Sequence, residues 1–139
     1  MRYVREEIVK APAARVWELL VDVAGWPNWT ASMREIKRLD DGPFTVGSRS
    51  RVTQPKGRPT VWTVTNLEPM REFTWVAKQP GLSLEAVHRI DEAEDGVRTT
   101  LEFAASGPLA WLASLLMGSL IRSYVDMESA GLKRAAESG

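Results

Sequence analysis

The sequence predicts an α+β fold in which a curved antiparallel sheet wraps around a long C-terminal helix, with two short helices after the first strand. Two observations lead to this prediction. Between residues 35 and 105 the apolar residues recur with period two and are interrupted by turn-forming residues, as in a meander of antiparallel strands. From residue 109 to about residue 136 the apolar residues recur at helical spacing instead.

The N-terminal segment supplies the first strand and the two short helices. Residues 3–10 predict a strand of modest hydrophobicity. Pro12 suits the first turn of a helix, where its missing N–H is not needed, and residues 13–23 then carry apolar side chains at helical spacing. We expect this helix to end near Gly25. Pro27 can then begin a second, short helix that runs toward Met33.

Six further strands are expected at residues 35–39, 48–54, 60–67, 72–78, 84–91 and 97–105. The segments between them contain the breakers that hairpins require: Asp41-Gly42-Pro43, residues 55–59, Glu68-Pro69, Pro80-Gly81 and Asp95-Gly96. Because the connections are short, we expect successive strands to be antiparallel neighbours.

Alternation along the strands predicts which side chains line the concave side of the sheet. They are Val52, Gln54, Trp62, Val64, Phe73, Trp75, Ala77, Leu84, Ala86, His88, Ile90, Thr99, Leu101, Phe103 and Ala105. The register of the strands at 48–54 and 60–67 is open, since a shift of one residue would turn Arg51 or Thr63 inward instead.

This order of elements is a helix-grip arrangement, and several short motifs support a family resemblance. Residues 11–17, Asp22 and the run Trp26-Pro27-Asn28-Trp29 resemble the opening of the polyketide cyclase/dehydrase-like (SRPBCC) group of the START and Bet v 1-related superfamily. Residues 46–48, 64–69, 73–75 and 96–100 also match that group, so the resemblance covers essentially the whole chain. It implies a cavity for a small apolar or amphipathic molecule. The superfamily includes cyclases, lipid carriers, hormone receptors and chaperone cofactors, so the chemistry stays open.

Composition limits the number of domains and the kinds of partner and metal site that the chain can have. A chain of 139 residues with 44% hydrophobic residues predicts one domain over residues 1–139. Basic and acidic residues number 18 each, so no net field favours nucleic acid as a partner. The absence of cysteine and the single histidine, His88, exclude disulfides and multi-histidine metal sites, and we expect neither a metal nor a cofactor.

The location expected from the sequence is cytoplasmic. The first residues are charged and contain no apolar signal core. The apolar stretch at residues 109–121 ends at Arg122 and is shorter than the roughly 20 residues that a membrane span needs.

Aromatic walls with a few polar groups are typical of small-molecule pockets. The ligand-binding residues expected here are Trp29, Met33, Val52, Gln54, Trp62, Trp75, His88, Phe103, Met117 and Tyr124. We expect Trp17 and Trp26 to fill the core instead. A carboxylate such as Glu7 or Glu128 would lie inside only if it were paired, protonated or functional, because an unpaired buried charge is costly.

Three classes of function fit these features. The first, which we favour, is binding of a small hydrophobic or aromatic ligand. The second is a cyclase, dehydratase or related lyase in which His88 or Tyr124 moves protons, although a buried histidine is more often structural. The third is a protein-interaction module that uses the apolar start of the last helix.

Residues 109–117 are apolar around most of the helix, so Trp111, Leu112, Leu115 and Leu116 should not all be enclosed in one monomer. We expect a lid over the cavity or a homodimer contact there. Membrane binding is disfavoured because the segment lacks a strongly basic flank.

Overall fold

The computed structural model describes residues 1–138, and its elements follow the predicted order. They are β1 (Arg2–Val9), α1 (Ala13–Val21), the 3₁₀ helix η1 (Val23–Asn28), β2 (Glu35–Arg38), β3 (Arg49–Thr53), β4 (Thr60–Glu68), β5 (Glu72–Gln79), β6 (Leu82–Ala93), β7 (Gly96–Ser106) and α2 (Ala110–Ser138). The α+β class with a helix-grip arrangement is confirmed.

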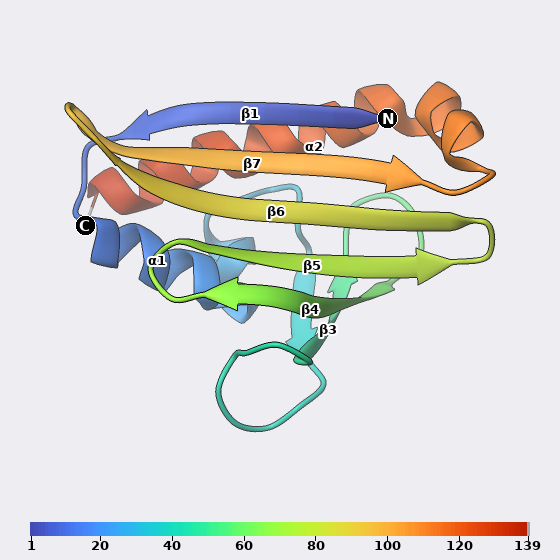
Figure 1. The fold of residues 1–139 in the computed structure, drawn as a ribbon, viewed down its shortest axis with the longest axis horizontal. Helices are drawn as coiled ribbons and strands as arrows, with labels where there is room; N and C mark the ends of the chain where they lie inside the picture. The colour runs from blue at the N-terminus through green and yellow to red at the C-terminus, as the bar shows by residue number, and fades with distance from the viewer. Residues whose placement is uncertain (139) are drawn as a thin grey trace.

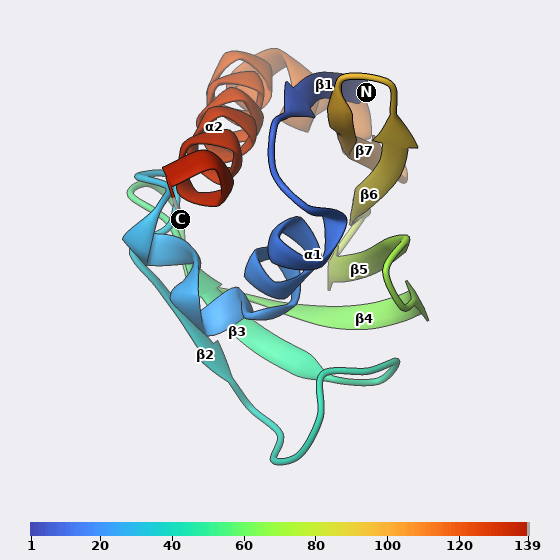
Figure 2. The same ribbon diagram turned by 90° about the vertical axis from the view of Figure 1, so that its left-hand side faces the viewer.

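The seven strands form one antiparallel sheet in the order β1-β7-β6-β5-β4-β3-β2 (Figure 1). Consecutive strands from β2 to β7 are neighbours, as the short connections predict. The pairing of β4 with β5 shifts between Val64 and Asn66. Such a bulge bends a strand and increases its twist, and the end-on view shows the sheet curving around the interior (Figure 2).

The long helix α2 lies across the open side of this curved sheet, while α1 and η1 close one end (Figure 2). Polar contacts attach α2 to β1: the Tyr3 hydroxyl donates to Asp126 at 2.7 Å, and Lys133 Nζ donates to the carbonyl of Ile8 at 2.7 Å. Glu137 accepts from the Lys10 backbone N–H and from Lys133, and these hydrogen bonds hold the pKa of the Glu137 carboxyl below its usual value. The helix is thereby held against the sheet along its C-terminal half.

The prediction of a short helix that runs from Pro27 toward Met33 is wrong. The structure has η1 earlier, at Val23–Asn28, with Pro27 inside it. The chain leaves helical geometry at Trp29, and the hydroxyls of Thr30 and Ser32 then form a buried hydrogen bond of 2.7 Å with each other. Such local side-chain bonding competes with continuation of a helix.

The burial of individual side chains shows the register of β3 and β4. Val52, Trp62 and Val64 are buried, whereas Arg51 is exposed and Thr63 is only partly buried. The concave faces of β3 and β4 therefore carry the side chains that alternation predicts.

The start of α2 is exposed, as expected for a helical segment that is apolar around most of its surface. Trp111, Leu115 and Leu116 are 67%, 74% and 72% exposed, and Leu112 is partly buried. None of the helices within residues 1–138 has the length and hydropathy needed to cross a membrane.

Candidate ligand-binding cavity

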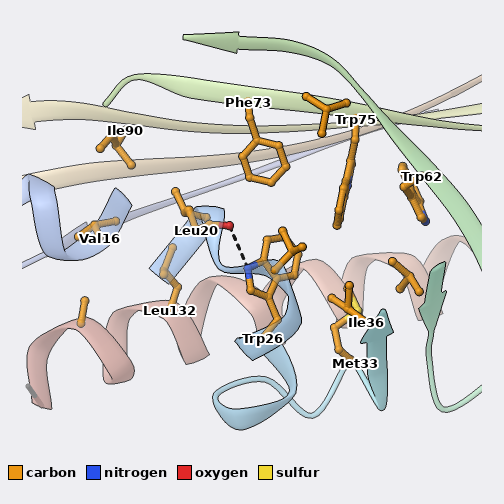
Figure 3. Close-up of a cluster of buried hydrophobic side chains, with 14 of the residues drawn as sticks. Val16, Leu20, Trp26, Met33, Ile36, Trp62, Phe73, Trp75, Ile90 and Leu132 are labelled. Carbon is orange, nitrogen blue, oxygen red and sulfur yellow. Dashed lines mark hydrogen bonds between the residues drawn. The ribbon is translucent and has the colours of Figure 1, made fainter. Parts of the chain in front are cut away.

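The interior has two halves: a packed one, whose buried side chains Figure 3 shows, and a hollow one. In the packed half, Val16 and Leu20 of α1 and Leu132 of α2 meet Phe73 and Ile90 of the sheet. Trp26 stands at the boundary, where its ring centroid lies 5.4 Å from that of Trp75. Its indole N–H donates to the Leu20 carbonyl at 3.1 Å, which fixes the orientation of the ring (Figure 3).

Beyond this boundary lies a cavity of about 520 Å³ between the sheet and α2. This volume is within the range of roughly 300–1,000 Å³ found for small-molecule sites. The first half of β6 contributes every second residue, namely Leu82, Leu84, Ala86 and His88. The helix contributes one stripe at helical spacing: Ala113, Met117, Leu120, Ile121, Tyr124, Val125 and Glu128.

Nine of the ten residues expected at a ligand site line this cavity: Met33, Val52, Gln54, Trp62, Trp75, His88, Phe103, Met117 and Tyr124. They come from the segment before β2, from five strands and their ends, and from α2. The structure thus brings together side chains that are far apart in the sequence.

Trp29 is the exception, and the expectation that it forms a cavity wall is corrected. It follows η1 and packs against Trp26 at a centroid distance of 5.5 Å, next to Gly131 of α2. Trp26, which we expected only to fill the core, is fully buried and also lines the cavity. Trp26 lies inside η1, whereas Trp29 follows the end of η1.

Two polar side chains meet at the inner wall. His88 is 2% exposed, and its ring stacks on Phe73 at 4.2 Å between centroids. Its Nδ1 lies 3.2 Å from the Phe73 carbonyl oxygen, and its Nε2 lies 3.6 Å from Oε1 of Glu128. Glu128 was not among the expected site residues. Its position on the stripe of Met117 and Tyr124, four residues after Tyr124, was the signal that could have identified it.

The mouth of the cavity is formed by two hairpin turns and α2. Residues 56–59 come from the β3–β4 turn, and residues 79, 80 and 82 come from the β5–β6 connection. The Tyr124 hydroxyl accepts from the Lys56 backbone N–H at 3.2 Å, which ties the first turn to the helix. Lys56 and Arg58 are exposed, so positive charge lies at the rim and the apolar wall lies inside.

Two alternative locations for a site are less favourable. Within residues 1–138, no group of three or more His, Cys, Asp or Glu side chains is arranged to hold a metal ion. A depression of about 640 Å³ lies on another face of α2, but the ion pair of Arg5 with Asp126, at 3.2 Å, belongs to its lining. We therefore place the candidate site in the interior cavity.

A curved sheet gripping a helix over an apolar cavity defines a helix-grip protein of the Bet v 1-like type. The chain belongs to the family described as polyketide cyclase / dehydrase and lipid transport, whose model matches residues 1–137. A comparison with curated proteins found no match.

Solved structures confirm the fold. A hypothetical protein from Helicobacter pylori is similar with a TM-score of 0.84 and 16% identity, over 98% of this chain and 88% of that one. A protein from Thermus thermophilus has a TM-score of 0.78 and 16% identity, over 99% and 98% of the two chains. The Aha1 dimer from Colwellia psychrerythraea has a TM-score of 0.74 and 17% identity, over 99% and 96%.

Proposed function

We propose that this protein binds a small hydrophobic or aromatic molecule in the cavity between the sheet and α2. The observation that supports the proposal best is the cavity of about 520 Å³, walled by Trp26, Trp62, Trp75 and Phe103. Flat aromatic walls bury much apolar ligand surface, and burial contributes about 25 cal/mol per Å². Membership of a family described by cyclase, dehydrase and lipid-transport functions is consistent with such a ligand.

A catalytic role is the alternative within the same family. His88 is the candidate base, because its Nδ1 lies 3.2 Å from the Phe73 carbonyl oxygen and its Nε2 faces Glu128 at 3.6 Å. The Tyr124 hydroxyl is engaged with the backbone of the β3–β4 turn. We favour binding because most of the cavity lining is apolar or aromatic and few of its groups could move a proton.

Filling the cavity tests the proposal. Ala86 lines the cavity, so Ala86→Trp should place an indole in the ligand's space. We expect the affinity for the neutral probe N-phenylnaphthylamine, measured by its fluorescence, to fall at least about tenfold. Ala104→Trp is the matched control, since Ala104 pairs with Glu85 and lies on the opposite face of the sheet. Equal binding by both variants, with intact circular dichroism spectra, would place the probe outside this cavity.

The exposed start of α2 favours a second candidate function, contact with a second copy of the chain. Trp111, Leu115 and Leu116 present a large apolar surface, which soluble monomers rarely keep exposed. A similarly folded protein, Aha1 from Colwellia psychrerythraea, was solved as a dimer.

Charge placed on this surface should prevent self-association. We expect the double variant Leu115→Glu with Leu116→Glu to weaken a dimer at least about tenfold, because each buried leucine contributes roughly 1.5–3 kcal/mol. Light scattering across protein concentrations measures the change, and Val46→Glu, at an exposed loop residue, is the control. A wild-type protein that stays monomeric at high concentration would refute this role.

A further inference from the structure

Glu128 has an unusual environment for a carboxylate. It is only 9% exposed, and it borders the cavity. Within residues 1–138 its carboxylate receives no hydrogen bond, and its ion-pair partner is His88, whose Nε2 lies 3.6 Å from Oε1. That separation is longer than a normal hydrogen bond of about 2.7–3.2 Å. The oxygens of Glu128 therefore have unused capacity to accept hydrogen bonds.

Packing fixes the orientation of the His88 ring, so the ring cannot turn to bring a donor closer to Glu128. The ring is stacked on Phe73, and Trp26 and Trp75 approach it edge-on at 5.3 and 5.8 Å. A carbonyl oxygen only accepts, so the 3.2 Å contact with Phe73 places a proton on Nδ1. Nε2 faces the same part of the cavity as Glu128, and its distance of 3.6 Å from Oε1 leaves the carboxylate without a hydrogen bond from the ring.

Because Glu128 lines the cavity, a ligand without a donor would cover its carboxylate and leave it unsatisfied, at a cost of roughly 1–3 kcal/mol and more when the group is charged. The two oxygens of the Glu128 carboxylate can accept from a hydroxyl or an amine that a ligand places beside them. Trp26 lies 5.3 Å from His88 between ring centroids, and the cavity wall also includes the apolar side chains of Trp62, Leu84, Ala86 and Phe103. The cavity thus has flat hydrophobic walls and one polar end that lacks a hydrogen-bond donor.

We propose that Glu128 and His88 form a polar anchor that selects ligands carrying a hydrogen-bond donor, a hydroxyl or an amine, at one end of a flat apolar body. The inference rests on the proposed binding function and specifies its ligand class. It also assigns the orientation of the bound ligand: the donor end enters first, and the apolar body lies toward Met117 and the mouth of the cavity. Glu128 is the central residue of this anchor.

Three naphthalene derivatives with the substituent on the same ring carbon test the proposal: naphthol, methylnaphthalene and naphthoate. Each is measured by its ability to displace N-phenylnaphthylamine. Naphthol and methylnaphthalene have nearly the same size and differ in one donor. We expect naphthol to bind the wild-type protein about tenfold more tightly, as for a hydrogen bond to a charged group. Naphthoate should bind most weakly, because its charge repels Glu128.

The variant Glu128→Leu should reduce the preference for naphthol to about threefold or less while methylnaphthalene still binds. Its thermal stability should be unchanged or higher, since a buried charge without a full partner is removed. Glu18→Leu, at an exposed residue of α1, is the matched control and should keep the wild-type preference.

The remaining outcomes separate this inference from the proposed function. Equal affinity for naphthol and methylnaphthalene in the wild-type protein, or an undiminished preference in Glu128→Leu, would refute the anchor alone. Tightest binding by naphthoate would also refute it and would place the polar end at Lys56 and Arg58 instead. Failure of all three compounds to displace the probe would contradict the binding function itself.

Discussion

Replacing Trp26 by Ala is expected to lower the free energy of unfolding by about 3–5 kcal/mol, the cost typical of removing a fully buried tryptophan. Trp26 is completely buried and packs against Trp29, Phe73, Trp75 and His88. The substitution would join the packed half of the interior to the cavity and remove the donor of the Leu20 carbonyl. Since domains are stable by only about 5–15 kcal/mol, the variant should be close to unfolding.

Urea denaturation followed by circular dichroism measures this loss. Trp17→Ala is the control, because Trp17 is only partly buried on α1 and should cost less. Trp26→Phe separates packing from hydrogen bonding: it keeps an aromatic ring but leaves the Leu20 carbonyl without its donor, at a cost of about 1–3 kcal/mol. A loss below about 1 kcal/mol for Trp26→Ala would contradict the role of this ring as the boundary of the core.

Gly131→Ala is expected to destabilise the protein even though alanine favours a helix by about 0.8–1 kcal/mol over glycine. A Cβ atom at Gly131 would overlap the backbone carbonyl oxygen of Trp29, which cannot move aside as a flexible side chain can. Helix α2 would have to withdraw from the segment after η1. Overpacking of this kind typically costs about 1–3 kcal/mol, so we expect a net loss.

The same helix provides an internal control for this prediction. At Gly118 the nearest atom to an added Cβ is in the Arg122 guanidinium, 3.3 Å away at the end of a flexible side chain. Gly118→Ala should therefore raise the stability by about 0.5–1 kcal/mol through helix propensity alone. Melting curves of both variants decide the matter, and a stabilised Gly131→Ala would show that α2 is not in close contact with Trp29.

Local patterns were sufficient to predict the order of elements. Period-two alternation placed Phe73, Trp75 and His88 on one side of the sheet, because successive side chains of a strand point to opposite faces. The turns at Pro80-Gly81 and Asp95-Gly96 marked the ends of β5, β6 and β7. These signals depend on neighbouring residues alone, so they can be read without knowing the fold.

The site was predicted less completely, for physical reasons that differ between residues. The positions of Trp26, inside η1, and of Trp29, after it, depend on where the 3₁₀ turn begins, and the sequence pattern placed this turn several residues too late. Glu128 was not selected because most glutamates are exposed. Its environment depends on how far α2 lies from β6, where His88 is located 40 positions earlier in the chain.

The sequence by itself determined the α+β class, the strand order along the chain, the long last helix and most of the cavity-facing side chains, because all of these follow from periodicity and turn chemistry. Only the tertiary structure decided the register of β3 and β4, the existence of an unfilled cavity and the meeting of Glu128 with His88. Each of these depends on distances between elements that are remote in the sequence. Such distances are set by packing, including the close contact of Gly131 with Trp29, and no local pattern encodes them.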